Sequence, residues 1–369
     1  MESKILGSSK LFYKKFSKIT SQQYLYLLYN RCNQKKGNTM NTLIKAGQDY
    51  KWNNNTMIIS CNFNMNCNLK CSYCINQNTR KEFNEELSPT ALYNLFSSLP
   101  LLKKDMYTFS IFGGEPSLYT YFPDVLKYMK EFIPANKLRA TWMTNGSLLH
   151  KLEEYFKDYQ EFNFNILITL HLEQINIDTY IKKLAQFKYP KMCTITFILE
   201  PGKLNETLLI IKKIQKLGYD KFFVKPIIID PKIYPNYTKE ELQFLTTSPY
   251  SSQTILFNEY MTEKQPDKKK FTQIEYLCNP DLINYQGLKC LAGYNSIVVF
   301  PDGTITQCQR TKKIPDFNLN TNSLLEYIYI YRPITCSDSS CTCIGFVSLP
   351  KWNPKFCDGP NYNKENFKK

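Results

Sequence analysis

The chain has 369 residues, of which 47 are Lys or Arg and 32 are Asp or Glu, so its net charge is +15. Hydrophobic residues make up 43% of the chain, which is enough for a large core and excludes an intrinsically disordered protein. This length suits two domains, or one α/β barrel with appendages. No apolar run reaches the roughly 18 residues of a membrane span and no signal peptide is recognisable, so we expect a cytoplasmic protein without membrane contact.

Cysteine is abundant and histidine is scarce: the chain has 13 Cys and 2 His. In a reducing compartment, cysteines are more often metal ligands or catalytic groups than disulfides. His150 and His171 are too few for a zinc site built on several histidines. Any metal would therefore depend on thiolate sulfur, which favours zinc or iron–sulfur clusters. The positive charge suits an acidic peptide or a nucleic acid, but a solvated lysine-rich surface explains it equally well.

The pattern of elements begins with residues 1–56, which we interpret as a basic helical extension. From Met57, short apolar runs alternate with amphipathic stretches, as in repeated βα units around a parallel sheet. The expected strands are Met57–Phe63, Tyr107–Phe112, Leu138–Met143, Asn165–Leu170, Cys193–Leu199 and Phe222–Pro226. The expected helices are Pro89–Leu99, Tyr121–Phe132, Ser147–Tyr159, Ile175–Gln186 and Asn205–Leu217. Six strands with five helices predict an α/β fold, a partial (β/α)6 barrel with one open side over residues 57–231.

The pattern changes after Pro231. Residues 232–277 are expected to form a helical linker, and residues 278–369 a small cysteine-rich domain. That domain contains one clear hairpin, Ser296–Phe300 with Thr304–Gln307, around the turn Pro301-Asp302-Gly303.

The first motif that could form a reactive site follows the first expected strand and reads Cys67-Asn68-Leu69-Lys70-Cys71-Ser72-Tyr73-Cys74. Three cysteines in one loop can hold three corners of a four-iron cluster, and the fourth iron is then open to another molecule. The carboxyl end of a barrel strand is also where such folds place their chemistry. Taken alone, the triplet is also compatible with a zinc knuckle that lacks its fourth ligand.

Polar or turn residues follow the next strands in order. Gly113-Gly114-Glu115-Pro116 comes after the second strand, where two glycines permit close approach to a ligand and Glu115 offers an acceptor to an ammonium group. The later strand ends carry Thr144-Asn145-Gly146, Thr169-Leu170-His171 and Leu199-Glu200-Pro201. Each is an ordinary βα loop by itself, but their joint order indicates a single binding site.

Over about residues 57–227, the three cysteines, the Gly-Gly-Glu-Pro motif and the Thr-Asn-Gly turn resemble the radical S-adenosylmethionine (SAM) superfamily. The resemblance implies that Cys67, Cys71 and Cys74 ligate a [4Fe–4S] cluster, whose open iron binds the amino and carboxylate groups of SAM. It also implies a set of cofactor-binding residues: Gly113, Gly114, Glu115 and Pro116 at the amino group, Tyr73 by the adenine, Thr144, Asn145, Thr169 and His171 at the ribose or carboxylate, and Leu199 at the next strand end.

The resemblance further implies the reaction. The reduced cluster passes one electron to SAM, and the resulting 5′-deoxyadenosyl radical removes a hydrogen atom from the substrate. Flavodoxin or ferredoxin is the expected reductant. Such a radical requires a cavity that excludes side reactions, which suits a barrel.

The C-terminal cysteines begin with Cys290 and Gly303-x-x-x-x-Cys308, which resembles the opening of the SPASM and twitch domains that bind auxiliary iron–sulfur clusters. The full SPASM cysteine run is absent. We therefore expect one auxiliary [4Fe–4S] cluster on Cys290, Cys308, Cys341 and Cys343, with Cys336, Cys278 or Cys357 as substitutes; a zinc ribbon is the alternative. Cys278 could instead return a hydrogen atom to a substrate radical. Cys61 and Cys193 are interpreted as core residues.

Three functional hypotheses follow. The first is a radical enzyme that crosslinks, epimerises or oxidises a peptide or protein side chain, because of the SPASM-like tail and the basic charge. The second keeps the class but gives it a small-molecule substrate, as in a dehydrogenase. The third is a zinc-binding or nucleic-acid-binding protein; it leaves Gly113–Pro116 unexplained, and no RNA-binding module is recognisable.

Overall fold

The computed structural model describes residues 56–76, 85–229, 232–233, 236–250, 255–257, 270–272, 285–308, 317–330, 334–337 and 351–352. The predictions for residues 1–55 and for Cys278, Cys341, Cys343 and Cys357 lie outside these ranges.

An eight-stranded sheet organises the described part of the chain, in the order β13-β12-β1-β2-β3-β4-β5-β6. Its main strands are β1 (Thr56–Asn62), β2 (Met106–Phe112), β3 (Leu138–Thr144), β4 (Asn163–Leu170), β5 (Cys193–Leu199) and β6 (Phe222–Pro226). Each of these six strands pairs in parallel with the next along the chain. Their carboxyl ends therefore lie along one edge, where the loops that follow them meet.

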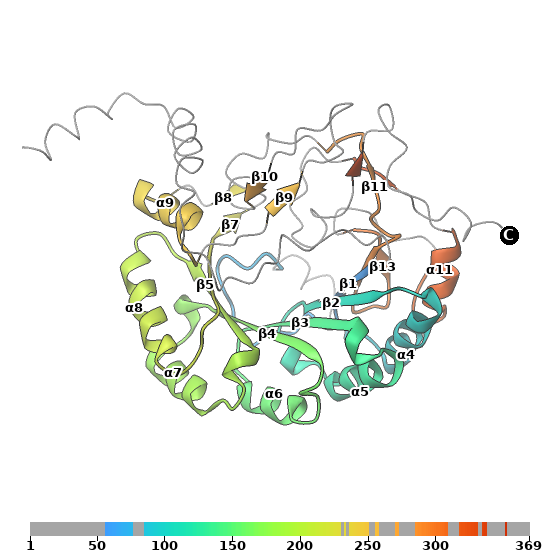
Figure 1. Cartoon of the computed structure of the whole chain (residues 1–369), viewed down its shortest axis with the longest axis horizontal. Helices are drawn as coiled ribbons and strands as arrows, with labels where there is room; N and C mark the ends of the chain where they lie inside the picture. The colour runs from blue at the N-terminus through green and yellow to red at the C-terminus, as the bar shows by residue number, and fades with distance from the viewer. Residues whose placement is uncertain are drawn as a thin grey trace, which may run out of the picture. The chain divides into compact units, whose positions relative to one another are not determined.

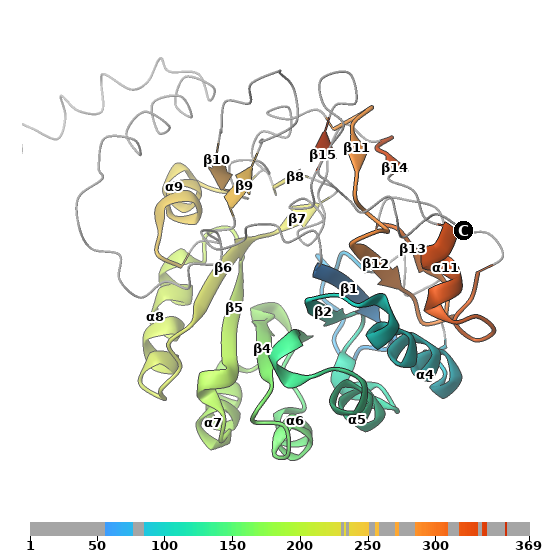
Figure 2. The same cartoon turned by 45° about the vertical axis from the view of Figure 1, so that its right-hand side comes forward.

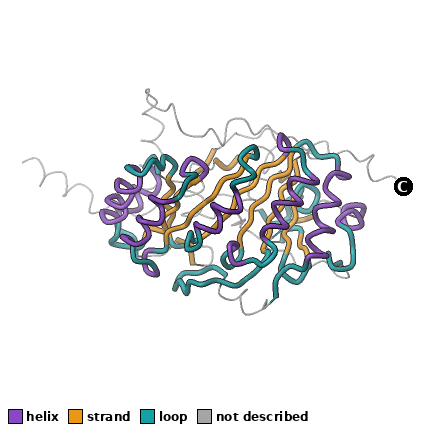
Figure 3. The backbone as a smooth tube through the Cα atoms, turned by 90° about the horizontal axis from the view of Figure 1, so that it is seen from below, coloured by secondary structure: helices purple, strands orange, loops and turns teal. Residues whose placement is uncertain are grey.

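Helices cover the outer face of this sheet, which curves as an open partial barrel (Figures 1 and 3). They are α4 (Pro89–Ser98), α5 (Phe122–Phe132), α6 (Leu149–Phe156), α7 (Ile177–Gln186) and α8 (Leu204–Gln215). The start of α4 follows from its sequence, because Ser88 caps it by accepting from the Ala91 N–H at 3.1 Å and Pro89 occupies its first turn. The predicted fold class is confirmed, with element ends shifted by a few residues.

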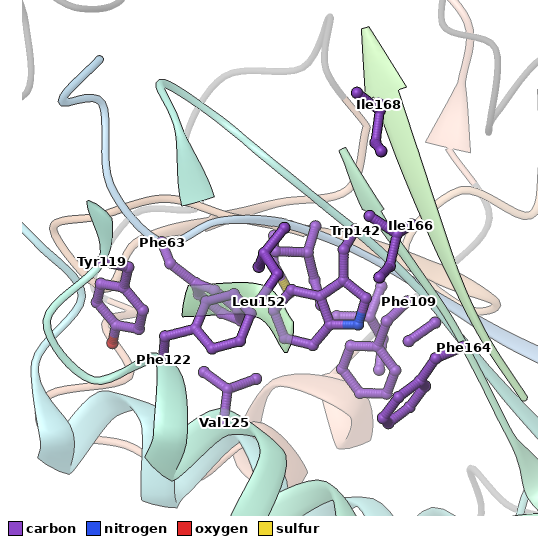
Figure 4. Close-up of a cluster of buried hydrophobic side chains, with 14 of the residues drawn as sticks. Phe63, Phe109, Tyr119, Phe122, Val125, Trp142, Leu152, Phe164, Ile166 and Ile168 are labelled. Atoms are coloured by element: carbon purple, nitrogen blue, oxygen red, sulfur yellow. The ribbon is translucent and has the colours of Figure 1, made fainter. Parts of the chain in front are cut away.

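The core lies between the outer face of the sheet and these helices. Side chains of Phe109, Trp142 and Ile166 point from alternate strand positions toward Phe122 on α5 and Leu152 on α6 (Figure 4). The two strand cysteines interpreted as packing, Cys61 and Cys193, are fully buried in this core, which confirms that interpretation. The opposite side of the sheet, which we call the inner face, carries the remaining alternate positions.

The predicted C-terminal hairpin exists as β12 (Ser296–Val299) and β13 (Ile305–Thr306). It extends the barrel sheet, because β12 pairs in parallel with β1 and buries Ile297 and Val299 in the main core (Figure 2). Sequence periodicity could not show this pairing, since it joins segments more than 230 residues apart. The expected domain boundaries near residues 56, 231 and 277 stay predictions.

The remaining elements are short. The expected helix in the linker region is α9 (Lys239–Thr247), and α11 (Leu324–Ile330) packs near α4. Two strand pairs were not expected, β7 (Ile228–Ile229) with β8 (Lys232–Ile233) and β9 (Ile255–Phe257) with β10 (Lys270–Thr272). A small sheet joins β11 (Lys289–Cys290) to β14 (Ile334–Thr335) and β15 (Lys351–Trp352). Within the described ranges, no helix is long and apolar enough to cross a membrane.

Candidate active site

The three-cysteine loop begins five residues after β1 ends, at the carboxyl edge of the sheet. The thiol of Cys71 is buried, and those of Cys67 and Cys74 are half-buried. The Cys67 sulfur accepts from the Leu69 N–H at 3.5 Å and from the Asn145 Nδ2 at 3.8 Å. Donors of this kind stabilise a thiolate and tune the potential of an iron–sulfur cluster.

The Gly-Gly-Glu-Pro loop packs directly against the backbone that leads to Cys67. Gly114 N–H donates to the Asn64 carbonyl at 3.1 Å, and Glu115 N–H donates to the Asn66 carbonyl at 2.7 Å. A Cβ on Gly114 would lie 2.0 Å from the Asn66 oxygen, and one on Gly113, whose φ is +132°, would lie 2.3 Å from the Asn64 oxygen. The close approach that requires both glycines is therefore between two loops of the protein.

Glu115 joins this loop to the end of β3. Its carboxylate is fully buried and accepts from the Ser117 N–H at 3.0 Å, the Thr144 hydroxyl at 2.7 Å and the Asn145 N–H at 2.6 Å. Pro116 begins the one-turn 3-10 helix Pro116–Leu118 that Glu115 caps. The expectation that Glu115 accepts from an ammonium group stays a prediction, and the contacts observed here hold two loops together.

The Thr-Asn-Gly turn after β3 contacts the cysteine loop itself. Asn145 Nδ2 donates to Asn68 Oδ1 at 2.9 Å, and Asn68 Nδ2 donates to Ser147 Oγ at the same distance. Tyr180 OH fixes the turn from behind by donating to the Asn145 carbonyl at 2.6 Å. The Gly-Gly-Glu-Pro loop and the Thr-Asn-Gly turn thus meet at the cysteine loop and the backbone that leads to it.

The other side of the cysteine loop rests on residues that follow β4. Tyr73 stacks on His171 with ring centroids 5.8 Å apart, and its hydroxyl lies 3.3 Å from His171 Nδ1. Glu173 accepts from the Ser72 N–H at 2.6 Å and from the Ser72 hydroxyl at 2.8 Å. Burial raises the pKa of Tyr73, and the charges of Cys71, Glu173 and Glu200 raise it further, so its phenol stays protonated. The sequence reasoning missed Glu173; its signal is an acidic residue two positions after the strand-end histidine His171.

On strand β5, the residue that was predicted to bind the cofactor is Leu199. Leu199 is fully buried in the outer core, because strand alternation puts it on the same side as Ile195 and Phe197. Its side chain therefore does not face the inner side, and its part in cofactor binding stays a prediction. Thr169 does lie on the inner face of β4, paired with Thr196 of β5.

The next residue, Glu200, is the polar group at this strand end, and the sequence reasoning gave it no role. Burial raises its pKa, and the charge of Glu173 adds to the shift. Among the described residues, one of its carboxylate oxygens is buried without a hydrogen-bond partner. The neighbouring Leu199 carbonyl accepts from the Tyr237 hydroxyl.

Comparison with known proteins decides the family. The profile of the Radical SAM superfamily matches residues 61–245, half of the chain, including all three loop cysteines and the strand ends described above. The chain belongs to the radical SAM superfamily.

Curated relatives match a smaller part of this radical SAM chain. Fe-coproporphyrin III synthase of Methanosarcina barkeri is 32% identical over 94 residues, 26% of this chain and 22% of that protein. The probable GTP 3',8-cyclase of Methanococcus maripaludis is 34% identical over 93 residues, 25% of this chain and 29% of that protein. The matches thus span less than a third of either relative.

Among solved structures, "Native anSMEcpe with bound AdoMet" aligns with a TM-score of 0.50 and 15% identity, over 75% of this chain and 81% of that one. At this identity the alignment supports the radical SAM fold and not the substrate.

Membership of the radical SAM superfamily implies a [4Fe–4S] cluster and SAM, and the residues of the cysteine loop fit such a cluster. Three cysteine thiols lie in one loop, and one of their sulfurs accepts from two N–H groups. In the described part of the chain, no three Cys, His, Asp or Glu side chains are grouped closely enough to hold a single metal ion. Thiolates around a cubane bind three different irons and leave the fourth iron open, which suits three cysteines carried by one loop.

A second group of cysteines lies near β11. Cys290 is buried, and burial raises the pKa of its thiol. The charges of Cys308 and Cys336 raise this pKa further, while the Lys351 ammonium opposes them. Cys336 N–H donates to the Leu288 carbonyl at 2.8 Å, which holds it beside β11. Cys336, expected as a substitute ligand, thus lies beside the strand that carries Cys290, and the ligand set of an auxiliary cluster stays a prediction.

Proposed function

We propose that this radical SAM enzyme modifies a peptide or protein side chain by crosslinking, epimerisation or oxidation. The observation that carries the substrate class is the second group of cysteines, Cys290, Cys308 and Cys336, within a SPASM-like pattern. The net charge of +15 adds support, because it favours encounter with an acidic peptide. A small-molecule dehydrogenase is the alternative, and a single auxiliary cluster is compatible with it.

In this proposal, Cys67, Cys71 and Cys74 hold the catalytic cluster, and SAM binds between the Gly113–Glu115 loop, the Thr144-Asn145 turn and the Tyr73–His171 pair. When bound, the cluster and SAM together supply one-electron chemistry that ends in removal of a hydrogen atom from the substrate. The protein itself positions these groups, because Glu115 and Asn145 connect the Gly-Gly-Glu-Pro loop, the turn after β3 and the cysteine loop by hydrogen bonds. We place the enzyme in the cytoplasm, with flavodoxin or ferredoxin as its reductant.

We further propose one auxiliary [4Fe–4S] cluster on Cys290, Cys308 and Cys336, with its fourth ligand from Cys341 or Cys343. Two contacts support this set, because Cys308 packs against the buried cluster of Cys290 and Cys336 bonds to the backbone just before β11. The proposed roles of Cys357 as a substitute ligand and of Cys278 as ligand or hydrogen donor stand as predictions.

Iron and sulfide content test the cluster assignment. Protein reconstituted without oxygen is expected to bind about eight irons, and replacement of Cys67, Cys71 and Cys74 together by Ala should leave about four. Replacement of Cys290 and Cys308 is the matched experiment, which should leave the SAM-cleaving cluster in place. Colourless protein that contains zinc and no iron would refute the radical SAM chemistry.

Mass spectrometry tests the substrate class. Peptides encoded beside the gene are incubated with the reduced enzyme and SAM. A modified peptide should lose hydrogen, as in a crosslink or an oxidation, or take up a solvent deuteron in D2O, as in an epimerisation. If no peptide changes while deuterium moves from a labelled small alcohol into 5′-deoxyadenosine, the dehydrogenase alternative replaces the peptide proposal.

A further inference from the structure

The inner face of the barrel sheet mixes polar and apolar side chains and carries almost no charge. In strands β1 to β6, its polar side chains include the hydroxyls and amides of Ser60, Asn62, Thr108, Ser110, Thr141, Asn165, Thr169, Thr194 and Thr196, and apolar side chains such as Met143, Leu167 and Ile198 lie among them. No acidic residue occupies an inner-face position of these six strands. Arg139 is exposed at the amino end of β3, away from the candidate active site. The one cation near the carboxyl edge of these strands is Lys225 on β6.

Lys225 faces inward because its neighbours in β6 face outward. Phe222, Val224 and Pro226 are buried, whereas Lys225 is only partly buried, and it pairs across the sheet with Ile198 of β5. It stands one residue before the end of β6. Its side chain therefore belongs to the same edge of the barrel as the cysteine loop.

Lys225 has no counter-ion among the described residues, in contrast to exposed lysines such as Lys188, whose ammonium lies 2.8 Å from Glu153. Burial alone lowers the pKa of Lys225, and no described carboxylate offsets the shift. Removing an ammonium group from water without a compensating partner is costly, so such a site favours an anion that restores the charged form.

A second unpartnered group lies beside it. Thr196 on β5 is 1% exposed, and its hydroxyl has no hydrogen-bond partner in the described structure. Thr196 pairs with Phe223, two residues before Lys225, so the two polar side chains are diagonal neighbours on one face. That spacing is within reach of a long lysine side chain.

We propose that Lys225 and Thr196 bind a carboxylate group of the substrate inside the barrel. The ammonium and the hydroxyl are two donors, and a carboxylate has two oxygens that accept from them. The inference rests on the proposed function, because it takes the inner face as the space for the substrate. The carboxylate is an acidic side chain or the C-terminus of a peptide in the main proposal, and that of a small acid in its alternative.

The test measures protection of Lys225 from acetylation in the reconstituted full-length enzyme with SAM, by peptide mass spectrometry. Four probes separate the sources of the carboxylate: a short peptide with one Glu and an amidated C-terminus, the same peptide with Gln, the Gln peptide with a free C-terminus, and glutarate. Thr196→Val and the exposed outer-surface control Lys212→Met are treated in the same way. Iron content and SAM cleavage without probe are recorded for each variant.

At least one acidic probe should protect Lys225 at about tenfold lower concentration than the fully amidated Gln peptide, and Thr196→Val should remove much of that advantage. Lys212→Met should leave it unchanged. Equal protection by acidic and amidated probes would overturn the inference, as would full protection by SAM alone, which would assign Lys225 to the carboxylate of SAM. If the inference is overturned while the protein still binds iron and cleaves SAM, the proposed function survives. If the protein neither binds iron nor cleaves SAM, the inference and the proposed function both fail.

Discussion

Replacement of Gly114 by Ala tests whether the cysteine loop depends on its contact with the Gly-Gly-Glu-Pro loop. The new Cβ would lie 2.0 Å from the Asn66 oxygen and 2.5 Å from the Met65 carbonyl carbon, both backbone atoms that cannot rotate away. Ordinary contact begins near 3.4 Å, so the two loops must separate by more than 1 Å. We therefore expect loss of the loop geometry and not a local adjustment.

The magnitude follows from the bonds that cross this contact. Separation breaks the Gly114 N–H bond to Asn64 and the Glu115 N–H bond to Asn66, each worth about 0.5–1.5 kcal/mol net. With the strain of the displaced backbone, the free energy of unfolding should fall by about 2–4 kcal/mol. Because Cys67 directly follows Asn66, iron binding should fall as well.

Urea unfolding followed by near-UV circular dichroism, and iron quantification after anaerobic reconstitution, measure the two effects. Gly202→Ala is the control: it has open space for a Cβ, and its φ of +81° should cost only about 1–2 kcal/mol. The control should also keep its full iron content. A Gly114→Ala protein with wild-type iron and stability within about 0.5 kcal/mol would refute the reasoning.

Three further predictions concern charged and aromatic groups. Burial lowers the pKa of Lys104 to about 8, so the unfolded protein binds more protons than the folded protein between pH 8 and 10.5. In urea titrations, the unfolding free energy of the wild type should therefore rise relative to that of Lys104→Met by about 2 kcal/mol from pH 7.5 to 9.5. A difference that does not change with pH would contradict this prediction. Tyr73→Phe removes the hydroxyl beside His171 and should weaken SAM binding by about fivefold at unchanged iron content, as equilibrium dialysis would show. Lys351→Met removes a positive charge beside Cys290 and should lower the midpoint potential of the auxiliary cluster in a redox titration followed by electron paramagnetic resonance; an unchanged potential would argue against a cluster there.

The barrel could be predicted from the sequence because its strands are short apolar runs separated by amphipathic helices. Strands β5 and β6 have the predicted bounds, and Ser88-Pro89 correctly marked the start of α4. The pairing of β12 with β1 could not be predicted, because the residue pattern of a strand does not indicate which other strand it pairs with. Non-local pairing of this kind is fixed by packing, here by Ile297 and Val299 entering the main core.

The candidate site shows a different limit. Sequence order identified which strand ends carry polar residues, but it could not say whether a side chain faces SAM, another loop or the core. Leu199 and Glu200 are adjacent, yet alternation buries the first in the outer core and leaves the second at the barrel edge. A shift of one residue along the strand therefore moves a side chain from the edge of the barrel into the core.

Glu115 illustrates why the site is built from contacts between loops. Its carboxylate is buried and accepts from Thr144 and Asn145, and Asn145 in turn donates to Asn68 in the cysteine loop. A buried carboxylate is stable only when donors surround it, so the loops that supply those donors are held together by the cost of separating them. Glu115 and Asn145 therefore tie the Gly-Gly-Glu-Pro loop, the turn after β3 and the cysteine loop into one hydrogen-bonded unit.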